Sequence, residues 1–484
     1  MFSIVLVALF LGAMILIGVW GMKKTTSLND FFLGGRSIGP WISALAYSTS
    51  YFSAVIFIGF AGKLGWEFGL NVLWIAVGNT LFGSCLAWLV LGRRTRRMSQ
   101  NLDVMTMPEF INDRFDGSYL KIFSAIIIFT FLLPYSASVF KGLGHLFEVN
   151  FGISYDLALL IMIVITGVYL VMGGYFAITM TDFIQGIIMI IGSILMITVL
   201  IGKSGGLVNT IAQIAEKYPA HIPAGRVPSP FMLFSLVFMT SFGTWGLPQM
   251  VQKYYAIRDE KVIKTAAIVT TLVGGIISFS AYFNGSMTHI FFDSVPLENG
   301  KAAFDKLIPF LLSTHLPEIL MGIILLLVLS ASMSSLSSLV LVSASSISID
   351  IFKGHINPSI NKKNSLALMR FLSAIFIVIS YFIARYEFAL IVTLMSLSWG
   401  VVAGTFMAPF LYGLYWKRTT RAGITAGMIT GASLAIILFF VLGPRNSPIA
   451  STIAMLAPFI VIPAVSLFTQ PPSKETIEKA FNNI

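Results

Sequence analysis

The chain is 484 residues long, with 57% hydrophobic and only 11% charged residues. Soluble proteins carry about 25% charged residues, so this composition excludes an ordinary soluble domain and indicates an integral membrane protein. The formal net charge is +11, and Cys85 is the single cysteine, which excludes an intrachain disulfide.

The hydrophobic segments, taken in chain order, predict about 13 transmembrane helices of about 20 residues each. The first segment has no basic start and no small-residue cleavage site, so we expect a retained helix there and not a signal peptide. The predicted helices are centred near Ala13, Tyr51, Val77, Phe131, Val164, Met189, Met239, Gly275, Val328, Phe376, Val401, Leu434 and Phe459.

Lys and Arg are distributed unevenly between the two sets of predicted loops. Most of the 31 basic residues, among them Arg114 and Lys253, fall in loops on one side. Loops rich in Lys and Arg remain in the cytoplasm. We therefore expect a multi-pass protein of the cell membrane, with its N-terminus outside and its C-terminus inside. The positive charge is then explained by topology, and no binding of nucleic acid is expected.

Short polar connections separate the hydrophobic segments. Residues 27–40, SLNDFFLGGRSIGP, contain turn residues and are expected to form a short inner connection. Residues 107–115, MPEFINDRF, are expected to form an interfacial helix, and the longest outer loops are expected near 203–229 and 292–316. No linker is long enough to separate soluble domains, so residues 1–484 are predicted to form one transmembrane domain.

The second predicted helix contains a high density of hydroxyl groups. Within ALAYSTSYFSAVIFIG, residues 44–59, every residue from Tyr47 to Ser53 except Phe52 carries a hydroxyl. A continuous lipid-facing helix does not need them, whereas an unwound segment tolerates them because hydroxyls replace lost backbone hydrogen bonds. The pattern favours a broken helix that forms a site, and a polar seam between helices is the alternative.

Two ionisable residues lie inside predicted helices, where charges are costly and often functional. Lys141, in LLPYSASVFKGLGHLFE (132–148), could extend to the interface or could contact an anionic group of a solute. Asp182, in GGYFAITMTDFIQG (173–186), could cap a helix together with Thr181 or could supply negative charge to a binding site.

The seventh predicted helix is interrupted. In TSFGTWGLPQMVQ, residues 240–252, Gly243, Gly246 and Pro248 fall close together. Proline removes a backbone donor and clashes with the preceding turn. Such an interruption inside a span exposes carbonyls and half-helix ends that can bind an ion or a solute, and a simple proline kink is the alternative.

The ninth predicted helix carries a serine-rich face within LSASMSSLSSLVLVSASSIS, residues 329–348. The residues at helical spacing on this face are Ala331, Ser334, Ser335 and Ser338, with Ser337 at its border. Small residues allow helices to pack closely. Hydroxyls can also replace the water shell of a small hard cation if carbonyl oxygens complete the coordination. Both interpretations stay open on this pattern alone.

Four passages together resemble the sodium/solute symporter family, in pattern most like its bacterial proline, pantothenate and monocarboxylate carriers. The passages keep their order and are DFFLGGRSIGPW (30–41), TDFIQG (181–186), GLPQ (246–249) and ASMSSLSSLVLVSASSISIDIF (331–352). The resemblance implies an all-α membrane fold of the leucine-transporter type, whose core of two inverted five-helix repeats covers about 38–413. An extra first helix would cover 1–25, and two C-terminal helices would cover about 422–470.

The same resemblance implies sodium as the coupling ion, bound at one or two sites whose residues match positions of this chain. The first site corresponds to the backbone carbonyls of Thr49, Phe52 and Ala331 and the hydroxyls of Ser334 and Ser335. A second site, which some members have, corresponds to Asp182, Ser334, Ser337 and Ser338. The serine face would then line one or two sodium sites, with Asp182 contributing charge to the second.

The resemblance also implies sodium-driven import of a small organic solute by alternating access. We expect a carboxylate-bearing solute, such as an amino acid or a monocarboxylate, although proline carriers have an aspartate where this chain has Tyr51. A sugar or sialic acid-type carrier, or a proton-coupled carrier with Asp182 as proton acceptor, is the alternative. The predicted solute contacts are Tyr51, Ser53, Tyr135, Lys141, Trp245 and Gln249.

An enzyme is not expected, because the sequence contains neither an HExxH metal motif nor a GxSxG nucleophile motif. The expected partners are the solute, Na⁺ and the lipid bilayer. The sequence points to no obligate protein partner.

Overall fold

The computed structural model describes residues 2–24, 32–172, 175–222, 227–298 and 300–482. Within these ranges the chain is almost entirely helical, and its strands are one short antiparallel pair, β1 (Leu297–Glu298) and β2 (Lys301–Ala302). Helices labelled η have 3-10 or π geometry. In the first half of the chain the helices are α1 (Phe2–Lys24), η1 (Gly34–Arg36), α3 (Pro40–Tyr51), η2 (Val55–Phe60), α4 (Ala61–Phe68), η3 (Gly69–Val72), α5 (Leu73–Gly78), η4 (Asn79–Leu86), α6 (Ala87–Asn101), α7 (Met107–Phe115), α8 (Ser118–Phe151), α9 (Tyr155–Met172), α10 (Tyr175–Lys203) and α11 (Leu207–His221).

The second half of the chain continues the same helical pattern. Its helices are α12 (Pro230–Phe242), η5 (Gly243–Trp245), α13 (Pro248–Ala256), α14 (Lys261–Ser286), α15 (Thr288–Phe291), α16 (Phe304–His315), α17 (Glu318–Ser345), η6 (Ser346–Ile356), α18 (Lys362–Arg385), α19 (Ile391–Tyr415), α20 (Arg421–Leu442), η7 (Pro444–Asn446), α21 (Ser447–Leu467) and α22 (Lys474–Ala480).

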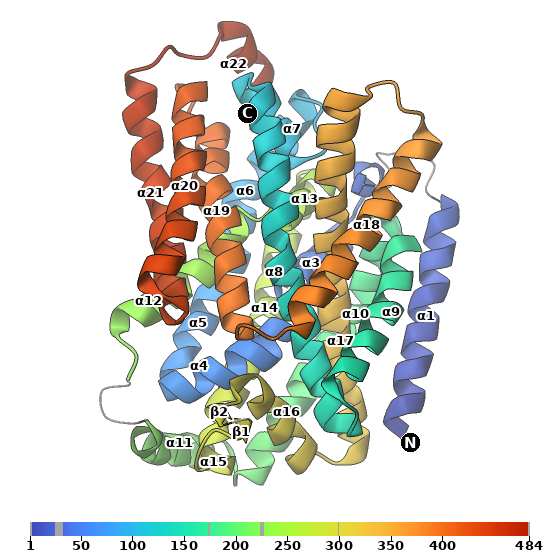
Figure 1. Cartoon of the computed structure of the whole chain (residues 1–484), viewed down its shortest axis with the longest axis vertical. Coiled ribbons are helices and arrows are strands. Elements are labelled where there is room, and N and C mark those ends of the chain that lie inside the picture. Colours follow the sequence, from blue (N-terminus) through green and yellow to red (C-terminus); the bar gives the residue numbers. More distant parts are fainter. Residues whose placement is uncertain (1, 25–31, 173–174, 223–226, 299, 483–484) are drawn as a thin grey trace.

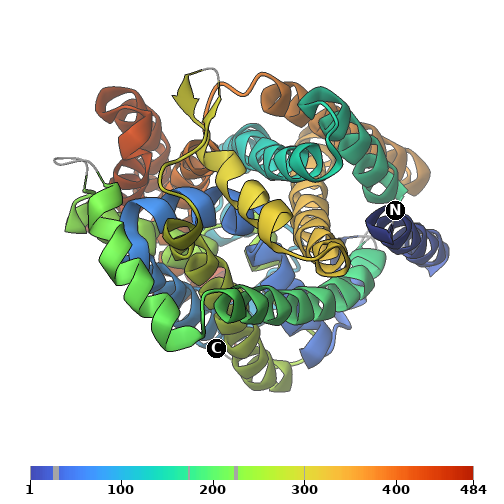
Figure 2. The same cartoon turned by 90° about the horizontal axis from the view of Figure 1, so that it is seen from below.

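The long helices run side by side between two faces of the molecule (Figure 1). The N-terminal end of α1 lies at the lower face, together with α11, α15, α16 and the β1–β2 pair, whereas α7 and α22 lie at the upper face. Seen from below, α1 stands at the edge of the bundle and α16 crosses over its middle (Figure 2). The segments predicted as the two longest outer loops therefore contain helices and a strand pair, and both lie at one face.

The described residues contain ten helices long and apolar enough to cross a membrane, or eleven if one bent pair counts as a single span. The predicted number of about 13 therefore stays a prediction, although each predicted centre falls on a helix. The difference has a physical reason. The second and seventh predicted spans are broken into shorter helices, and such pieces do not reach the length of a continuous span by themselves. The fifth predicted span counts among the described residues only as a shorter apolar helix, Tyr155–Val164.

Both predicted interruptions are present as breaks. Helix α3 ends at Tyr51, and Phe52 is extended, with φ −107° and ψ 116°, before the chain becomes helical again. The other break follows the 3-10 turn η5, where Leu247 is extended before Pro248 starts α13, and the two parts meet at 41°. A simple proline kink is therefore the wrong interpretation of residues 240–252.

Helix α17 lies at the centre of the bundle, against α1, α3, α8, α10 and α18. Helices α17 and η6 form one continuous segment, Glu318–Ile356, and 83% of the residues in its most apolar part are buried, compared with 28% in the corresponding part of α18. An apolar helix that is buried on all sides contacts protein and not lipid. The serine hydroxyls of α17 therefore meet neighbouring helices, and these neighbours decide what the serines do.

Several basic residues assigned to the inner side are buried inside the structure, and Lys253 lies within the seventh predicted span and not in a loop. The guanidinium of Arg114, on α7, donates from Nε to the carbonyl of Gly413 at 3.1 Å. Lys253, on α13, is only 1% exposed. The predicted helix over 107–115 is confirmed as α7, which begins with a reciprocal capping box between Thr106 and Glu109.

Candidate functional site

The break after α3 releases backbone carbonyls in the middle of the protein. In a regular helix the carbonyls of Thr49 and Ser50 would accept hydrogen bonds from the N–H groups four residues later. Those residues, Ser53 and Ala54, lie beyond the break at Phe52. The two carbonyls are therefore available to other donors or to a cation.

Hydroxyl groups of α17 meet these carbonyls. The Ser334 hydroxyl donates to the Thr49 carbonyl at 2.7 Å and to the Ala331 carbonyl at 3.2 Å. The Ser335 hydroxyl donates at 3.3 Å to the carbonyls of both Thr49 and Ser50. Helices α3 and α17, which are far apart in the sequence, thus meet at these carbonyls. Four of the five residues predicted for the first sodium site are in direct contact there.

The fifth predicted residue, Phe52, is the extended residue of the break and is buried. The first cluster, defined as Thr49, Ala331, Ser334 and Ser335, contains only neutral oxygen ligands. Carbonyl and hydroxyl oxygens suit a small hard cation, and a hydroxyl can accept a cation after rotating its hydrogen away. The donor set of the first cluster therefore fits sodium.

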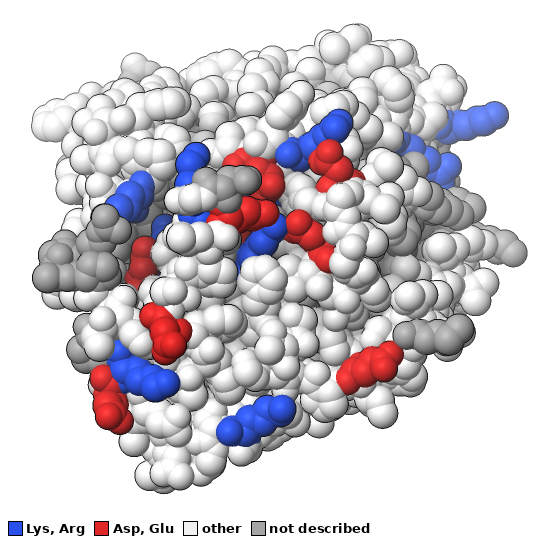
Figure 3. Space-filling model, turned by 60° about the horizontal axis from the view of Figure 1, so that its bottom comes forward, with Lys and Arg blue, Asp and Glu red and all other residues white. Residues whose placement is uncertain are grey.

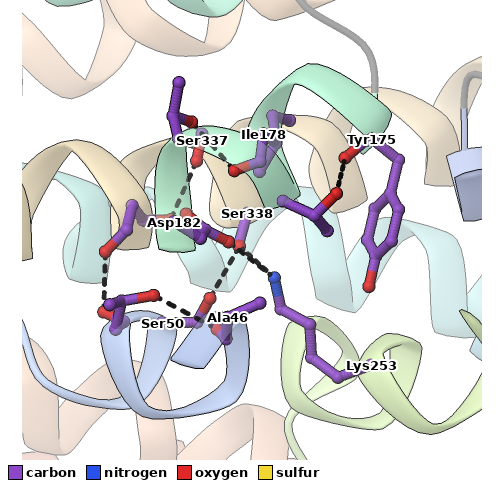
Figure 4. Close-up of polar contacts among 12 residues, drawn as sticks. Ala46, Ser50, Tyr175, Ile178, Asp182, Lys253, Ser337 and Ser338 are labelled. Carbon is purple, nitrogen blue, oxygen red and sulfur yellow. Dashed lines mark hydrogen bonds and ion pairs between the residues drawn. The ribbon is translucent and has the colours of Figure 1, made fainter. Parts of the chain in front are cut away.

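A second cluster adjoins α17 one helical turn further along (Figure 4) and consists of Ser50, Asp182, Lys253 and Ser338. The ammonium of Lys253 lies 3.3 Å from Oδ2 of Asp182 and 3.2 Å from the Ser338 hydroxyl. The hydroxyls of Ser338 and Ser50 are 3.0 Å apart. The second cluster thus connects α10, α13, α17 and α3, including both broken helices.

The remaining contacts of the predicted second sodium site differ from the expectation. The Ser337 hydroxyl donates to the Ser334 carbonyl of its own helix at 2.9 Å. Oδ1 of Asp182 has no hydrogen-bond partner among the described residues. Helix α10 begins at Tyr175, so Asp182 lies inside the helix and the helix-cap interpretation was wrong.

Sequence reasoning missed Lys253 because a predicted span of about 20 residues centred on Met239 ends before it. The structure extends that span from Pro230 to Ala256 through the break. The two parts meet at 41°, so the second part does not continue along the axis of the first, and the segment is longer in sequence than a straight span of about 20 residues. The Gly-Pro interruption was the signal that could have moved the boundary.

A small cavity lies beside the break of α3. Its volume is about 20 Å³, which is room for about one water molecule and not for an organic solute. The central site is therefore closed in this structure. The lining residues are Tyr51, Phe52, Ser53, Val55, Ile56, Phe60, Asn79, Thr240, Tyr282, Met395 and Trp399.

Three predicted solute contacts lie at or next to this cavity. Tyr51 and Ser53 line it, and the Tyr51 hydroxyl donates to the Thr240 carbonyl at 2.6 Å, which joins the two broken helices. Tyr135 is buried, and its ring lies edge-on against Trp399 of the cavity lining, with the ring centroids 5.9 Å apart. Tyr135 therefore lies directly behind one wall of the cavity.

The other predicted solute contacts are placed differently. The indole of Trp245 donates to the Phe82 carbonyl at 3.0 Å, and Trp245 is not among the residues that line the cavity. Gln249 is buried, and neither atom of its amide has a hydrogen-bond partner among the described residues. Lys141 lies elsewhere, with its ammonium 2.8 Å from the carboxylate of Asp305.

Lys141 belongs to a network of charges at the lower face, where acidic and basic side chains gather (Figure 3). Its ammonium also donates to the Ala389 carbonyl at 2.9 Å and lies 3.6 Å from Glu387. Burial would raise the pKa of Glu387, but the hydrogen bond with His145 lowers the pKa below its ordinary value. The Lys141 ammonium is thus paired with carboxylates and does not extend freely to the interface.

Sequence reasoning did not single out Asn79, Tyr282 or Trp399, all of which line the cavity. Each is an isolated polar or aromatic residue inside a hydrophobic segment, whereas the search selected dense hydroxyl runs and ionisable groups. Asn79, in VGNTLFG, is a polar amide at span depth and was the strongest available signal.

The two ends of the bundle differ in openness. A cavity of about 730 Å³ lies at the lower face, lined by residues including Trp66, Glu67, Phe304 and Leu390. Near the upper face, the cavity beside Asp350 has a volume of only about 10 Å³. The structure is therefore wide toward the lower face, closed at the centre and tightly packed toward the upper face.

Comparison with known proteins gives consistent matches over most of the chain. The sequence model of the sodium:solute symporter family matches residues 31–431. Sodium/proline symporter 2 of Staphylococcus saprophyticus is 30% identical over 469 residues, covering 95% of this chain and 89% of the relative. The osmoregulated proline transporter OpuE of Bacillus subtilis is 30% identical over 445 residues, covering 90% and 88%.

Solved structures show the same fold at lower identity. A substrate-bound, outward-open Na⁺-coupled sialic acid symporter superimposes with a TM-score of 0.81 at 17% identity, covering 98% of both chains. Mhp1, a nucleobase-cation-symport-1 family transporter in a closed conformation, gives a TM-score of 0.55 at 14% identity, covering 93% and 97%. These likenesses confirm the predicted leucine-transporter-type fold.

Proposed function

The chain belongs to the sodium:solute symporter family, and from this premise we propose that it imports a small carboxylate-bearing solute together with sodium. The observation that carries the proposal is the first cluster. There the Ser334 and Ser335 hydroxyls meet the Thr49 carbonyl across the break of α3. Sodium bound to these oxygens would hold α3 and α17 together and stabilise the arrangement that binds solute.

The solute is proposed to bind at the cavity beside this break once the cavity opens. The residues that line it carry no charged side chain. A carboxylate would therefore be met by hydroxyls, such as those of Tyr51 and Ser53, and by backbone N–H groups of the broken helix. The aromatic rings of Tyr51 and Trp399, 6.4 Å apart, offer faces to an apolar ring or to an ammonium group.

L-Proline is the first solute to test, because the relatives quoted above are named as proline carriers. It has a carboxylate, a cationic amine and an apolar ring, which match the hydroxyl and aromatic groups of the cavity lining. Tyr51 in place of the aspartate expected of proline carriers means that the amine would be met by an aromatic face and not by a carboxylate.

We assign the lower face to the outside of the cell, because the predicted cytoplasmic loops, rich in Lys and Arg, belong to the opposite face. The wide lower cavity would then be the entrance from outside, and opening of the tightly packed upper face would release the solute. Each sodium charge that crosses about 100 mV supplies about 2.3 kcal/mol, or roughly 50-fold accumulation of solute.

Uptake into proteoliposomes tests this proposal. Purified protein is supplied with labelled L-proline and a panel of amino acids and monocarboxylates, with an inward gradient of either sodium or choline. We expect accumulation of one of these solutes only with sodium. Accumulation that is equal in both gradients would contradict sodium coupling. Accumulation driven by a pH gradient in sodium-free buffer would favour the proton-coupled alternative.

A further inference from the structure

We propose that the ammonium of Lys253 takes the place of a second sodium ion, so that this carrier binds one sodium ion per chain. The inference deepens the proposed function and rests on it. Residues that match a second sodium site of some family members are present in this chain. The Lys253 ammonium, however, already lies among them.

The contacts of Lys253 are those that a bound cation would make. Its Nζ lies 3.3 Å from Oδ2 of Asp182 and 3.2 Å from the Ser338 hydroxyl, two of the four residues predicted for a second sodium. The ring of Tyr175 lies on another side, with its centroid 5.4 Å from Nζ. The ammonium is thus surrounded by a carboxylate, a hydroxyl and an aromatic face, all of which attract cations.

Burial makes this arrangement exclusive. The side chains of Lys253 and Asp182 are 1% and 0% exposed, so each charge needs the other for compensation. A sodium ion at the same carboxylate would add a second positive charge beside the ammonium, in a region from which water is excluded. The net charge of the pair is already zero, and the electrostatic reason for a second sodium ion is therefore absent.

The first cluster provides the contrast within the same molecule. Its oxygens come from Thr49, Ala331, Ser334 and Ser335, and no Lys or Arg side chain is recorded in contact with them among the described residues. The recorded partners of these carbonyls are neutral hydroxyl groups, so no fixed positive charge of the described residues occupies the position of a bound cation. One cluster therefore keeps the chemistry of an ion site, and the other contains its own cation.

The position of Lys253 has a consequence for transport. Lys253 lies on α13, directly after the break of the seventh predicted span, whereas Asp182 lies on α10. Ser50, which contacts Ser338, lies on the other broken helix, α3. A sodium ion here would leave in each cycle and use the gradient. An ammonium on a helix stays attached, so it can link the moving parts without being transported.

Counting bound sodium in the purified, full-length protein tests the inference. Equilibrium binding of radioactive ²²Na⁺ in choline buffer needs no knowledge of the solute. We expect one sodium ion per chain in the wild type, and two would overturn the inference while leaving the proposed function intact. Absence of any saturable sodium binding would instead contradict the proposed function itself, so the two failures are distinguishable.

Two substitutions at Lys253 separate charge from space. Lys253→Ala removes the ammonium and leaves room beside Asp182, so we expect the sodium count to rise from one to two. Lys253→Met removes the charge but fills most of the volume, so we expect the count to stay at one. A folded Lys253→Ala variant that still binds one sodium ion would overturn the inference.

Asp182→Asn keeps the test decisive if the lysine variants do not fold. Under the inference Asp182 holds an ammonium and no sodium, so the count is expected to be one in both the wild type and Asp182→Asn. A fall in the count from two to one on this substitution would show that the carboxylate binds sodium, and the inference would be wrong.

Discussion

The two polar clusters on α17 look alike in sequence and differ in the structure. Ser334 and Ser335 face the carbonyls released by the break of α3, whereas Ser338 faces the Asp182–Lys253 ion pair. The same residue type on one helix thus contributes to a neutral oxygen site in one place and to a charge-compensated site in the other. The comparison teaches that the groups facing a serine, and not the serine itself, decide whether it can bind a cation.

The largest effect is expected from breaking the charge balance of the second cluster. Lys253→Met leaves the Asp182 carboxylate buried without its cation. Removing one partner of a buried ion pair costs about 3–5 kcal/mol. We therefore expect a large decrease in the unfolding temperature of the purified protein, measured by thermal unfolding in the presence of saturating sodium.

The control is the double substitution Asp182→Asn with Lys253→Met, which removes both charges and keeps similar volumes. It is expected to recover most of the lost stability, because replacing both members of a buried pair is often nearly neutral. A double variant as unstable as Lys253→Met would mean that Lys253 stabilises the protein by packing and not by charge.

The next largest effect is expected in the first cluster. Ser334→Ala removes the hydroxyl that lies 2.7 Å from the Thr49 carbonyl. Loss of a buried polar contact of this kind costs about 1–3 kcal/mol, so the half-saturating sodium concentration should rise by roughly 5- to 150-fold. Sodium-dependent thermal stabilisation measures this concentration without requiring transport.

Ser332→Ala is the matched control for Ser334→Ala. Its hydroxyl is also buried on α17, but it donates to the Val328 carbonyl of the same helix at 2.7 Å. The sodium requirement should change by less than about twofold, because helix-internal bonds of this type contribute little. Equal effects of the two substitutions would contradict the assignment of the first cluster as the sodium site.

A smaller effect is expected for the link between sodium and solute. Tyr135→Phe removes the hydroxyl of a buried side chain whose ring packs against Trp399 of the cavity lining. Coupling between two bound ligands is reciprocal, so saturating L-proline should increase the sodium affinity of both proteins. We expect this increase to be about fivefold smaller in the variant than in the wild type. Sodium titrations with and without L-proline measure this difference; an unchanged coupling would exclude Tyr135 as the link.

The smallest effect is expected for Ser337→Ala, which sharpens the comparison at its border. The hydroxyl donates to the Ser334 carbonyl of its own helix and not to Asp182. We expect the half-saturating sodium concentration to change by less than about twofold, as for other helix-internal hydroxyls. A change of about tenfold would make Ser337 a sodium ligand and would favour an ion at the second cluster.

Much of this architecture could be predicted from local sequence patterns. A run of hydroxyls at 47–53 and a Gly-Pro interruption at 243–248 indicated two broken helices, and both breaks are present. Broken helices leave this signal because unpaired backbone groups inside a membrane need nearby polar substitutes, and proline cannot complete a helical hydrogen bond. The serine spacing on one face likewise follows from helical geometry alone.

The sequence by itself determined that this is a helical membrane protein with breaks at two places and a serine face, because hydrophobicity and backbone hydrogen bonding act between neighbours in the chain. Only the tertiary structure decided that Lys253 faces Asp182, that Lys141 faces Asp305, and that the cavity is completed by residues such as Trp399. These contacts join helices that are distant in sequence. A buried charged side chain requires a partner of opposite charge, but its sequence position does not identify that partner, which depends on how the helices pack.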